Sequence, residues 1–109
     1  MTSKDAGQFP EDVAAAISVL GDQTNSAIIK YLIEYRQATL GMLLKHTGAQ
    51  RYALSRRLTV LEDADVVVVD EPRGERTGKV LVYRLNTSRL NQLYTAWRNY
   101  VLEDIEGLT

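Results

Sequence analysis

The chain has 109 residues, of which 45% are hydrophobic and 25% charged, and its 13 basic and 14 acidic side chains give a net charge of −1 at pH 7. This length fits one domain with a modest core, and a sequence pI of about 5.8 excludes a uniformly basic nucleic-acid-binding domain, whose pI is typically above about 9. The absence of cysteine excludes disulfides and thiolate metal ligands, and no run is apolar enough for a signal peptide or a membrane span, so we expect a cytoplasmic protein.

The first part of the chain is predicted to contain an arm and two helices. Residues 1–9 are small and polar and are expected to form a flexible arm, which leaves 10–109 as the folded domain. Apolar residues recur at helical spacing over 13–20 and a glycine follows, which predicts a first helix. Thr24 is the predicted N-cap of a second helix over about 25–34, whose broad apolar face indicates that it is mostly buried.

A helix, a glycine break and another helix follow. Thr39 is the predicted N-cap of a third helix, and Gly48 supplies the left-handed conformation that ends this helix and turns the chain sharply. A fourth helix is expected over about 50–64, with leucines on one face and polar and basic residues on the other. The order helix, turn, helix is typical of a DNA-reading module.

The remainder of the chain is predicted to form a hairpin and a long helix. Segments 66–71 and 79–86 are rich in Val and Tyr, and a proline and glycines lie between them, which predicts two strands with a long basic tip. Ser88 is the predicted N-cap of a last helix over 88–108 that has apolar residues along one face.

Two stretches resemble a known family. Residues 19–35, VLGDQTNSAIIKYLIEY, resemble the "LGDPTRxxIL" opening of the ArsR-like winged-helix regulators, and residues 48–67, GAQRYALSRRLTVLEDADVV, resemble their "GLSQSTVSRHLKVLREAGLV" recognition-helix region. This resemblance implies a winged helix-turn-helix, mainly α with a β-hairpin wing in the order α-α-α-α-β-β-α, and a DNA-binding homodimer. Asn25, Gln50 and Asp65 depart from the pattern, since the family usually has Arg, a capping Ser or Thr, and Gly at these positions.

The resemblance does not extend to metal sensing. The metal sensors of this family use Cys pairs, or clusters of His and carboxylates on the last helix. This chain has no Cys, and its single histidine is His46. We therefore expect neither a metal site nor a cofactor, and we interpret His46 as a polar residue near a helix end.

The candidate DNA-reading surface is the outward face of the fourth helix. No Asp or Glu lies between Tyr35 and Leu61, so the positive charge of the chain is concentrated there. The residues predicted to reach base edges are Gln50, Arg51, Tyr52, Ser55 and Arg56. The residues predicted to contact the DNA backbone are Lys45, Arg57 and Thr59. By spacing alone this face could equally be an ordinary solvated helix surface.

The hairpin tip is a second candidate contact. Arg73, Arg76 and Lys79 could enter a minor groove or bind phosphates. Glu71 and Glu75 dilute their positive charge, and charged tips also serve solubility.

The first and last helices carry more apolar surface than one small domain needs to bury. They are therefore expected to pair across a two-fold axis. The residues predicted for this dimer interface are Val13, Ile17, Leu90, Leu93, Tyr94, Trp97 and Val101. An alternative for the aromatic residues is the lining of a small-molecule pocket.

The sequence favours a sequence-specific transcriptional regulator, most simply a repressor, that binds double-stranded DNA at a near-palindromic operator as a homodimer. The alternative is a winged-helix protein-interaction or DNA-segregation adaptor, but a protein-docking face should be more apolar than the Arg-rich fourth helix. An enzyme is not expected, because the chain has no nucleophile beside a histidine, no carboxylate pair in a shared motif and no phosphate-binding loop. Nothing in the sequence indicates an effector or a membrane partner.

Overall fold

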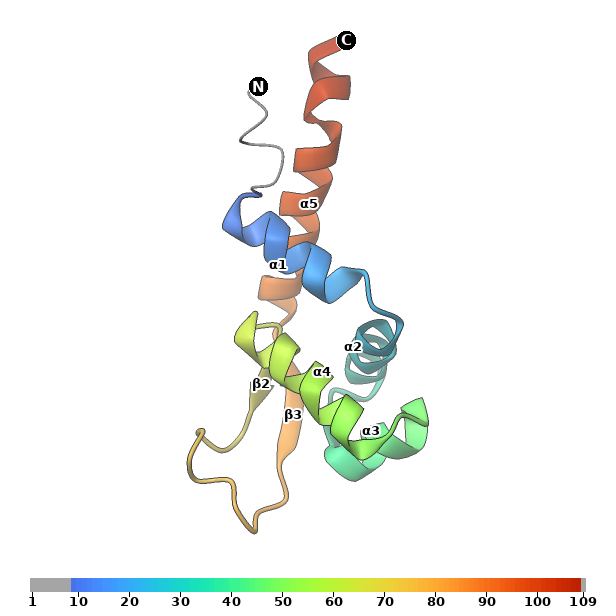
Figure 1. Cartoon of the computed structure of the whole chain (residues 1–109), viewed down its shortest axis with the longest axis vertical. Coiled ribbons are helices and arrows are strands. Elements are labelled where there is room, and N and C mark those ends of the chain that lie inside the picture. Colours follow the sequence, from blue (N-terminus) through green and yellow to red (C-terminus); the bar gives the residue numbers. More distant parts are fainter. Residues whose placement is uncertain (1–8, 109) are drawn as a thin grey trace.

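The computed structural model describes residues 9–108, with side chains through Glu103. Figure 1 shows a group of helices with a hairpin projecting at one end and one long helix extending beyond the rest at the other. The helices are α1 (Glu11–Leu20), α2 (Gln23–Tyr35), α3 (Leu40–Thr47), α4 (Arg51–Asp63) and α5 (Thr87–Leu108). The strands are β1 (Gln37–Thr39), β2 (Val67–Val69) and β3 (Val82–Leu85), arranged in the antiparallel order β1-β3-β2. The predicted fold class, mainly α with a β wing, is confirmed. Residues 1–8 of the predicted arm lie outside the described residues.

Strand β1 is not expected from the sequence. Its residues 37–39 pair with Val82–Arg84 of β3, and Gln37 lies opposite Arg84. A segment this short carries no alternating pattern of its own, so only its partner strand makes it a strand. The hairpin strands β2 and β3 are also shorter than the predicted segments 66–71 and 79–86.

Two helix starts differ from the prediction. The N-cap of α2 is Asp22, whose Oδ1 accepts a hydrogen bond from the Asn25 backbone nitrogen at 2.8 Å, so Thr24 lies inside the helix. Helix α5 begins at Thr87, and Asn86 Oδ1 accepts from the Arg89 nitrogen at 3.2 Å. In both cases a carboxylate or amide upstream of the predicted hydroxyl residue occupies the capping position.

The predicted turn around α3 is confirmed. Thr39 is the N-cap of α3, and its hydroxyl accepts a hydrogen bond from the Met42 nitrogen at 3.3 Å. At the other end Gly48 has a φ of 69° and its nitrogen donates to the Leu44 carbonyl. This left-handed residue ends α3 and sends the chain directly into α4.

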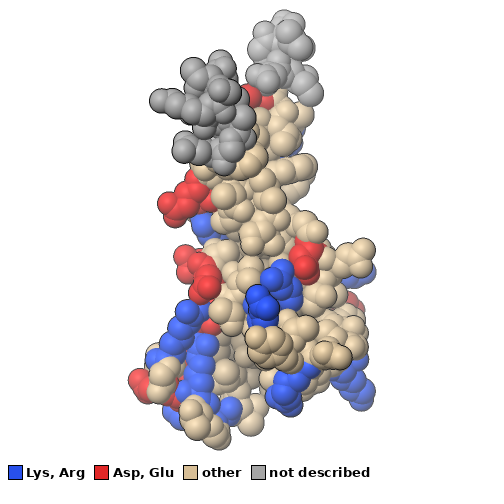
Figure 2. Space-filling model, viewed as in Figure 1, with Lys and Arg blue, Asp and Glu red and all other residues tan. Residues whose placement is uncertain are grey.

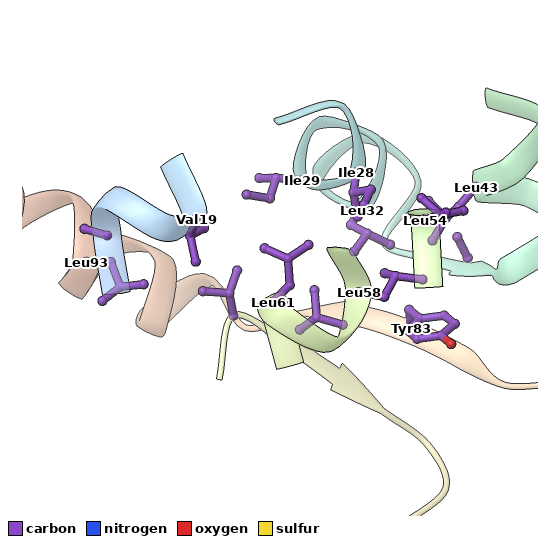
Figure 3. Packing of buried hydrophobic residues seen from close by; sticks show 14 residues of the cluster. Val19, Ile28, Ile29, Leu32, Leu43, Leu54, Leu58, Leu61, Tyr83 and Leu93 are labelled. Atoms are coloured by element: carbon purple, nitrogen blue, oxygen red, sulfur yellow. The ribbon is translucent and has the colours of Figure 1, made fainter. Parts of the chain in front are cut away.

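The core is one cluster of buried side chains from all five helices and the three strands (Figure 3). Helices α2, α3 and α4 contact the strands, whereas α1 lies against α5. Helix α4 contributes one buried side, and α2 lies against it. The fully or nearly fully buried residues labelled in Figure 3 are Val19, Ile28, Ile29, Leu32, Leu43, Leu54, Leu58, Leu61, Tyr83 and Leu93. Because the leucines of α4 face inward as predicted, the opposite side of α4 must face solvent.

Asn25 joins α1 to α2 inside this core. Its side chain is fully buried, and Nδ2 donates to the backbone carbonyls of Ser18 and Val19 at the end of α1, at 3.3 and 3.2 Å. The last carbonyls of a helix lack partners within the helix, so this amide supplies the missing donors. Asn25 thereby has a structural role at the position where the resembled family usually has Arg.

Candidate nucleic-acid interface

The outward face of α4 is exposed and positively charged. Arg51, Tyr52 and Arg56 are exposed, Tyr52 to 74% of its maximum. Gln50 occupies the N-cap position in an extended conformation, and its side chain makes no capping hydrogen bond. Ser55 is half-buried on the same helix. The structure therefore brings the predicted base-reading residues together at the start and on the outer side of α4.

Arg56 and Tyr52 interact with each other. The guanidinium carbon of Arg56 lies 6.0 Å from the centroid of the Tyr52 ring, the outer limit of a cation–π contact. Within the described part of the chain, neither Arg51 nor Arg56 forms an ion pair with a carboxylate. Both cations of this face are thus available to an anionic partner.

The predicted backbone-contacting residues do not share one environment. Lys45 is exposed in the last turn of α3. The Thr59 hydroxyl donates to the Ser55 carbonyl of the preceding turn at 3.1 Å. Arg57 is half-buried, and its Nη1 lies 3.2 Å from Oδ2 of Asp22, the N-cap of α2. Arg57 therefore links α4 to the start of α2, a role that sequence reasoning missed because the partners lie far apart in the chain.

The wing cations are paired with carboxylates. Arg76 Nη2 lies 2.6 Å from Glu62 Oε2, Arg73 Nη2 lies 2.7 Å from Asp63 Oδ1, and Lys79 Nζ lies 2.8 Å from Glu71 Oε1. The hydrogen bond from Arg76, reinforced by that from Arg73, holds the pKa of Glu62 below its ordinary value. The wing is therefore not the unopposed basic tip that its sequence suggests.

In Figure 2 the Lys and Arg side chains gather over the half of the molecule that carries α3, α4 and the wing. The half that carries α1 and the outer part of α5 shows fewer of them on this face. This asymmetry explains how a chain with a net charge of −1 can present a locally positive surface.

The residues predicted for a dimer interface fall into two groups. Val13 and Leu93 are buried within the chain, at 3% and 0% exposure, so their side chains are not accessible to a partner. Leu90 is half-buried. The remaining residues are exposed large apolar side chains, namely Ile17, Tyr94, Trp97 and Val101. Ile17, Tyr94 and Trp97 line a groove of about 370 Å³ between α1 and α5.

Solved structures of transcriptional regulators resemble this chain over most of its length. An ArsR family transcriptional regulator is 21% identical with a TM-score of 0.66, and the match covers 91% of this chain and 92% of that one. A possible transcriptional regulator for arsenical resistance is 23% identical with a TM-score of 0.66, over 92% and 94% of the two chains. The transcriptional repressor BigR from Xylella fastidiosa is 21% identical with a TM-score of 0.60, over 90% and 95%. The chain has the winged helix-turn-helix fold.

This fold identifies α3 and α4 as the helix-turn-helix and the β2–β3 hairpin as the wing, as the sequence resemblance implies. No protein-family model matches the chain, and no curated protein sequence matches it significantly. Among the described residues there is no group of His, Cys, Asp and Glu that could hold a metal ion. None of the described helices is both long and apolar enough to cross a membrane.

Proposed function

We propose that the protein is a sequence-specific DNA-binding transcriptional regulator that reads DNA through α4. The observation that carries this proposal is the outer face of α4, where exposed Arg51, Tyr52 and Arg56 follow Gln50 and no carboxylate among the described residues pairs with the two arginines. The second helix of a helix-turn-helix enters the major groove with its N-terminal residues against base edges. The placement of Gln50 and Arg51 at the start of α4 fits this geometry.

Each residue of this face has a role suited to its chemistry. Arg51 and Arg56 can form paired hydrogen bonds to guanine, and Gln50 can do so to adenine. The Tyr52 ring lies at the outer limit of a cation–π contact with the Arg56 guanidinium. Lys45 lies on the preceding helix and can contact a phosphate, which positions the protein without reading sequence.

We infer that the regulator acts as a homodimer. Helix α5 extends beyond the domain body (Figure 1), and the radius of gyration of 16.2 Å exceeds the value of about 13 Å for a compact domain of this length. The apolar groove between α1 and α5 lies along this helix. A second copy would cover the groove and place two α4 helices on a near-palindromic operator, with half-sites about 34 Å apart. A dimer bound there would most simply act as a repressor.

Selection of duplexes from a random pool, followed by a mobility-shift assay, tests the function. Arg56→Ala should weaken binding to the selected operator by about 10- to 100-fold, because a paired base contact contributes about 1–3 kcal/mol. Asn99→Ala removes an exposed polar side chain on another side of α5 and should leave affinity unchanged. Failure to enrich any sequence, with Arg56→Ala behaving as the wild type, would contradict the proposal and favour a protein-interaction or DNA-segregation adaptor.

A further inference from the structure

The end of α4 and the wing are joined by a cluster of ion pairs, which we call the wing latch and define as Glu62, Asp63, Arg73 and Arg76. Glu62 accepts from Nη1 and Nη2 of Arg76 at 3.0 and 2.6 Å, one hydrogen bond to each carboxylate oxygen. Arg73 Nη2 lies 3.4 Å from Glu62 and 2.7 Å from Asp63. Both carboxylates are in the last turn of α4, so the latch fixes the wing against the helix proposed to read DNA.

Every nitrogen of the Arg76 guanidinium is already hydrogen-bonded. Its Nε donates to the Glu71 backbone carbonyl at 2.9 Å, and both Nη atoms donate to Glu62. The Arg76 and Glu62 side chains are only 23% and 20% exposed. A partly buried, bidentate pair between a guanidinium and a carboxylate is a strong form of ion pair and is screened little by salt. A DNA phosphate could take over the paired face of Arg76 only by displacing Glu62.

The loop that carries these arginines has few other anchors. The wing strands span only Val67–Val69 and Val82–Leu85, and Val80 in the loop is 77% exposed. Two turn-type hydrogen bonds, the ion pairs with Glu62, Asp63 and Glu71, and the bond from Arg76 Nε to the Glu71 carbonyl hold the tip. At its base Asp70 and Val82 exchange hydrogen bonds. Loops with few buried contacts open at low free-energy cost, so the latch determines where the arginines lie.

We propose that Glu62 is a positioning residue that withholds Arg76 from DNA, so that the protein reads DNA through the α3–α4 face and Arg76 contributes no phosphate contact while the latch is closed. This inference rests on the proposed DNA binding and adds to it. For Arg76 it replaces the expectation that the wing arginines contact phosphates directly. Loss of the Glu62 carboxylate would release the Arg76 guanidinium next to the proposed DNA surface and increase affinity for DNA of any sequence.

Matched variants of the full chain test the proposal. Glu62→Gln removes the latch carboxylate that pairs with Arg76. Glu75→Gln removes one negative charge from the wing at an exposed residue that forms no ion pair within the described residues. Affinity for a random-sequence duplex is measured across a series of salt concentrations. Glu62→Gln should bind several-fold more tightly and steepen the logarithmic salt slope by about 0.9 for each additional phosphate that the protein neutralises. Glu75→Gln should keep the wild-type slope.

Removal of the arginine gives a second, independent measurement. Arg76→Ala in the wild-type background should leave the salt slope unchanged, and Arg76→Ala combined with Glu62→Gln should reverse part of the steepening caused by Glu62→Gln. A wild-type slope that falls by about 0.9 on Arg76→Ala, or a Glu62→Gln slope equal to that of Glu75→Gln, would overturn the proposal. The single Arg76→Ala measurement decides the question even if Glu62→Gln does not fold.

A readout without DNA separates this inference from the proposed function. The Arg76 Nε–H should give a resolved, slowly exchanging NMR signal in the free wild-type protein, and Glu62→Gln should increase its exchange rate. Rapid exchange in the wild type would overturn the latch whatever the protein binds. A protected signal in a protein that binds no duplex would instead contradict the proposed function and, with it, the role of the latch in DNA binding.

Discussion

Two described residues other than glycine adopt positive φ, and each lies at a junction between elements. Arg36 has a φ of 74° at the C-terminal end of α2, and Asp65 has a φ of 63° between α4 and β2. Side chains with a Cβ are disfavoured here by about 1–2 kcal/mol, although Asp tolerates the region better than most residues. The Asp65 position is one where the resembled family usually has Gly, so the backbone geometry gives a physical reason for that preference.

We expect Arg36→Gly to raise the free energy of unfolding by about 1 kcal/mol, because relief of the Cβ strain outweighs the extra entropy of glycine in the unfolded chain. Asp65→Gly should have a smaller effect in the same direction. Gly48→Ala is the converse control. Gly48 has a φ of 69° and open space where a Cβ would lie, so an alanine there meets no neighbouring atom and is strained only by the backbone conformation. The substitution should lower the free energy of unfolding by about 1 kcal/mol. Urea denaturation of the three variants measures these changes, and a loss of stability in Arg36→Gly would show that its side chain stabilises the fold.

At the scale of elements, α4 shows how one helix divides its residues between stability and recognition. Leucines at its buried side hold it in the core, Arg57 ties it to the N-cap of α2, and its last turn holds the wing. Only the remaining side and the first turn are left for a ligand. The number of arginines in α4 therefore overstates its capacity to contact DNA.

Substitutions of Arg57 and of Lys45 should affect different properties of the protein. Arg57→Ala is expected to lower the free energy of unfolding by up to about 1 kcal/mol, since it breaks a half-exposed ion pair, and to leave the salt dependence of DNA binding unchanged. Lys45→Ala should leave stability unchanged and reduce the logarithmic salt slope by about 0.9 for each phosphate that is no longer neutralised. Denaturation midpoints and binding titrations at several salt concentrations measure both quantities. If Arg57→Ala instead reduced the salt slope and Lys45→Ala lowered the stability, Arg57 and not Lys45 would contact the phosphates.

For the whole molecule, the notable feature is an apolar stripe that stays exposed to solvent in a single chain. It consists of Ile17 on α1 and Tyr94, Trp97 and Val101 on α5. Trp97 is 39% exposed and Tyr94 53%, whereas Leu93 beside them is fully buried. Neighbouring positions on one helix thus belong to different surfaces, one facing the core of the same chain and one facing outward. The sequence pattern groups all of them on one broad apolar face and cannot distinguish the two.

We expect Trp97→Asp to convert a dimer into a folded monomer, because it places a charge in the proposed interface without removing a core side chain. Leu93→Asp should instead unfold the chain, since a buried unpaired charge costs several kcal/mol. Asn99→Asp changes an exposed residue on another side of α5 and should alter neither property. Sedimentation velocity and circular dichroism check these outcomes. A Trp97→Asp protein that stays dimeric would exclude this stripe from the interface.

Much of the winged helix-turn-helix is determined by local sequence. The spacing of leucines in α4, the Thr39 cap and Gly48 depend on residues within a few positions of one another, so helices, the sharp turn and the exposed side of α4 follow from the sequence alone. Strand β1, the Asp22–Arg57 pair, the division of the α5 stripe and the pairing of the wing arginines with Glu62 and Asp63 depend on the tertiary structure. These features join residues on different elements, and charge or hydrophobicity at one position does not reveal which distant group will neutralise or cover it.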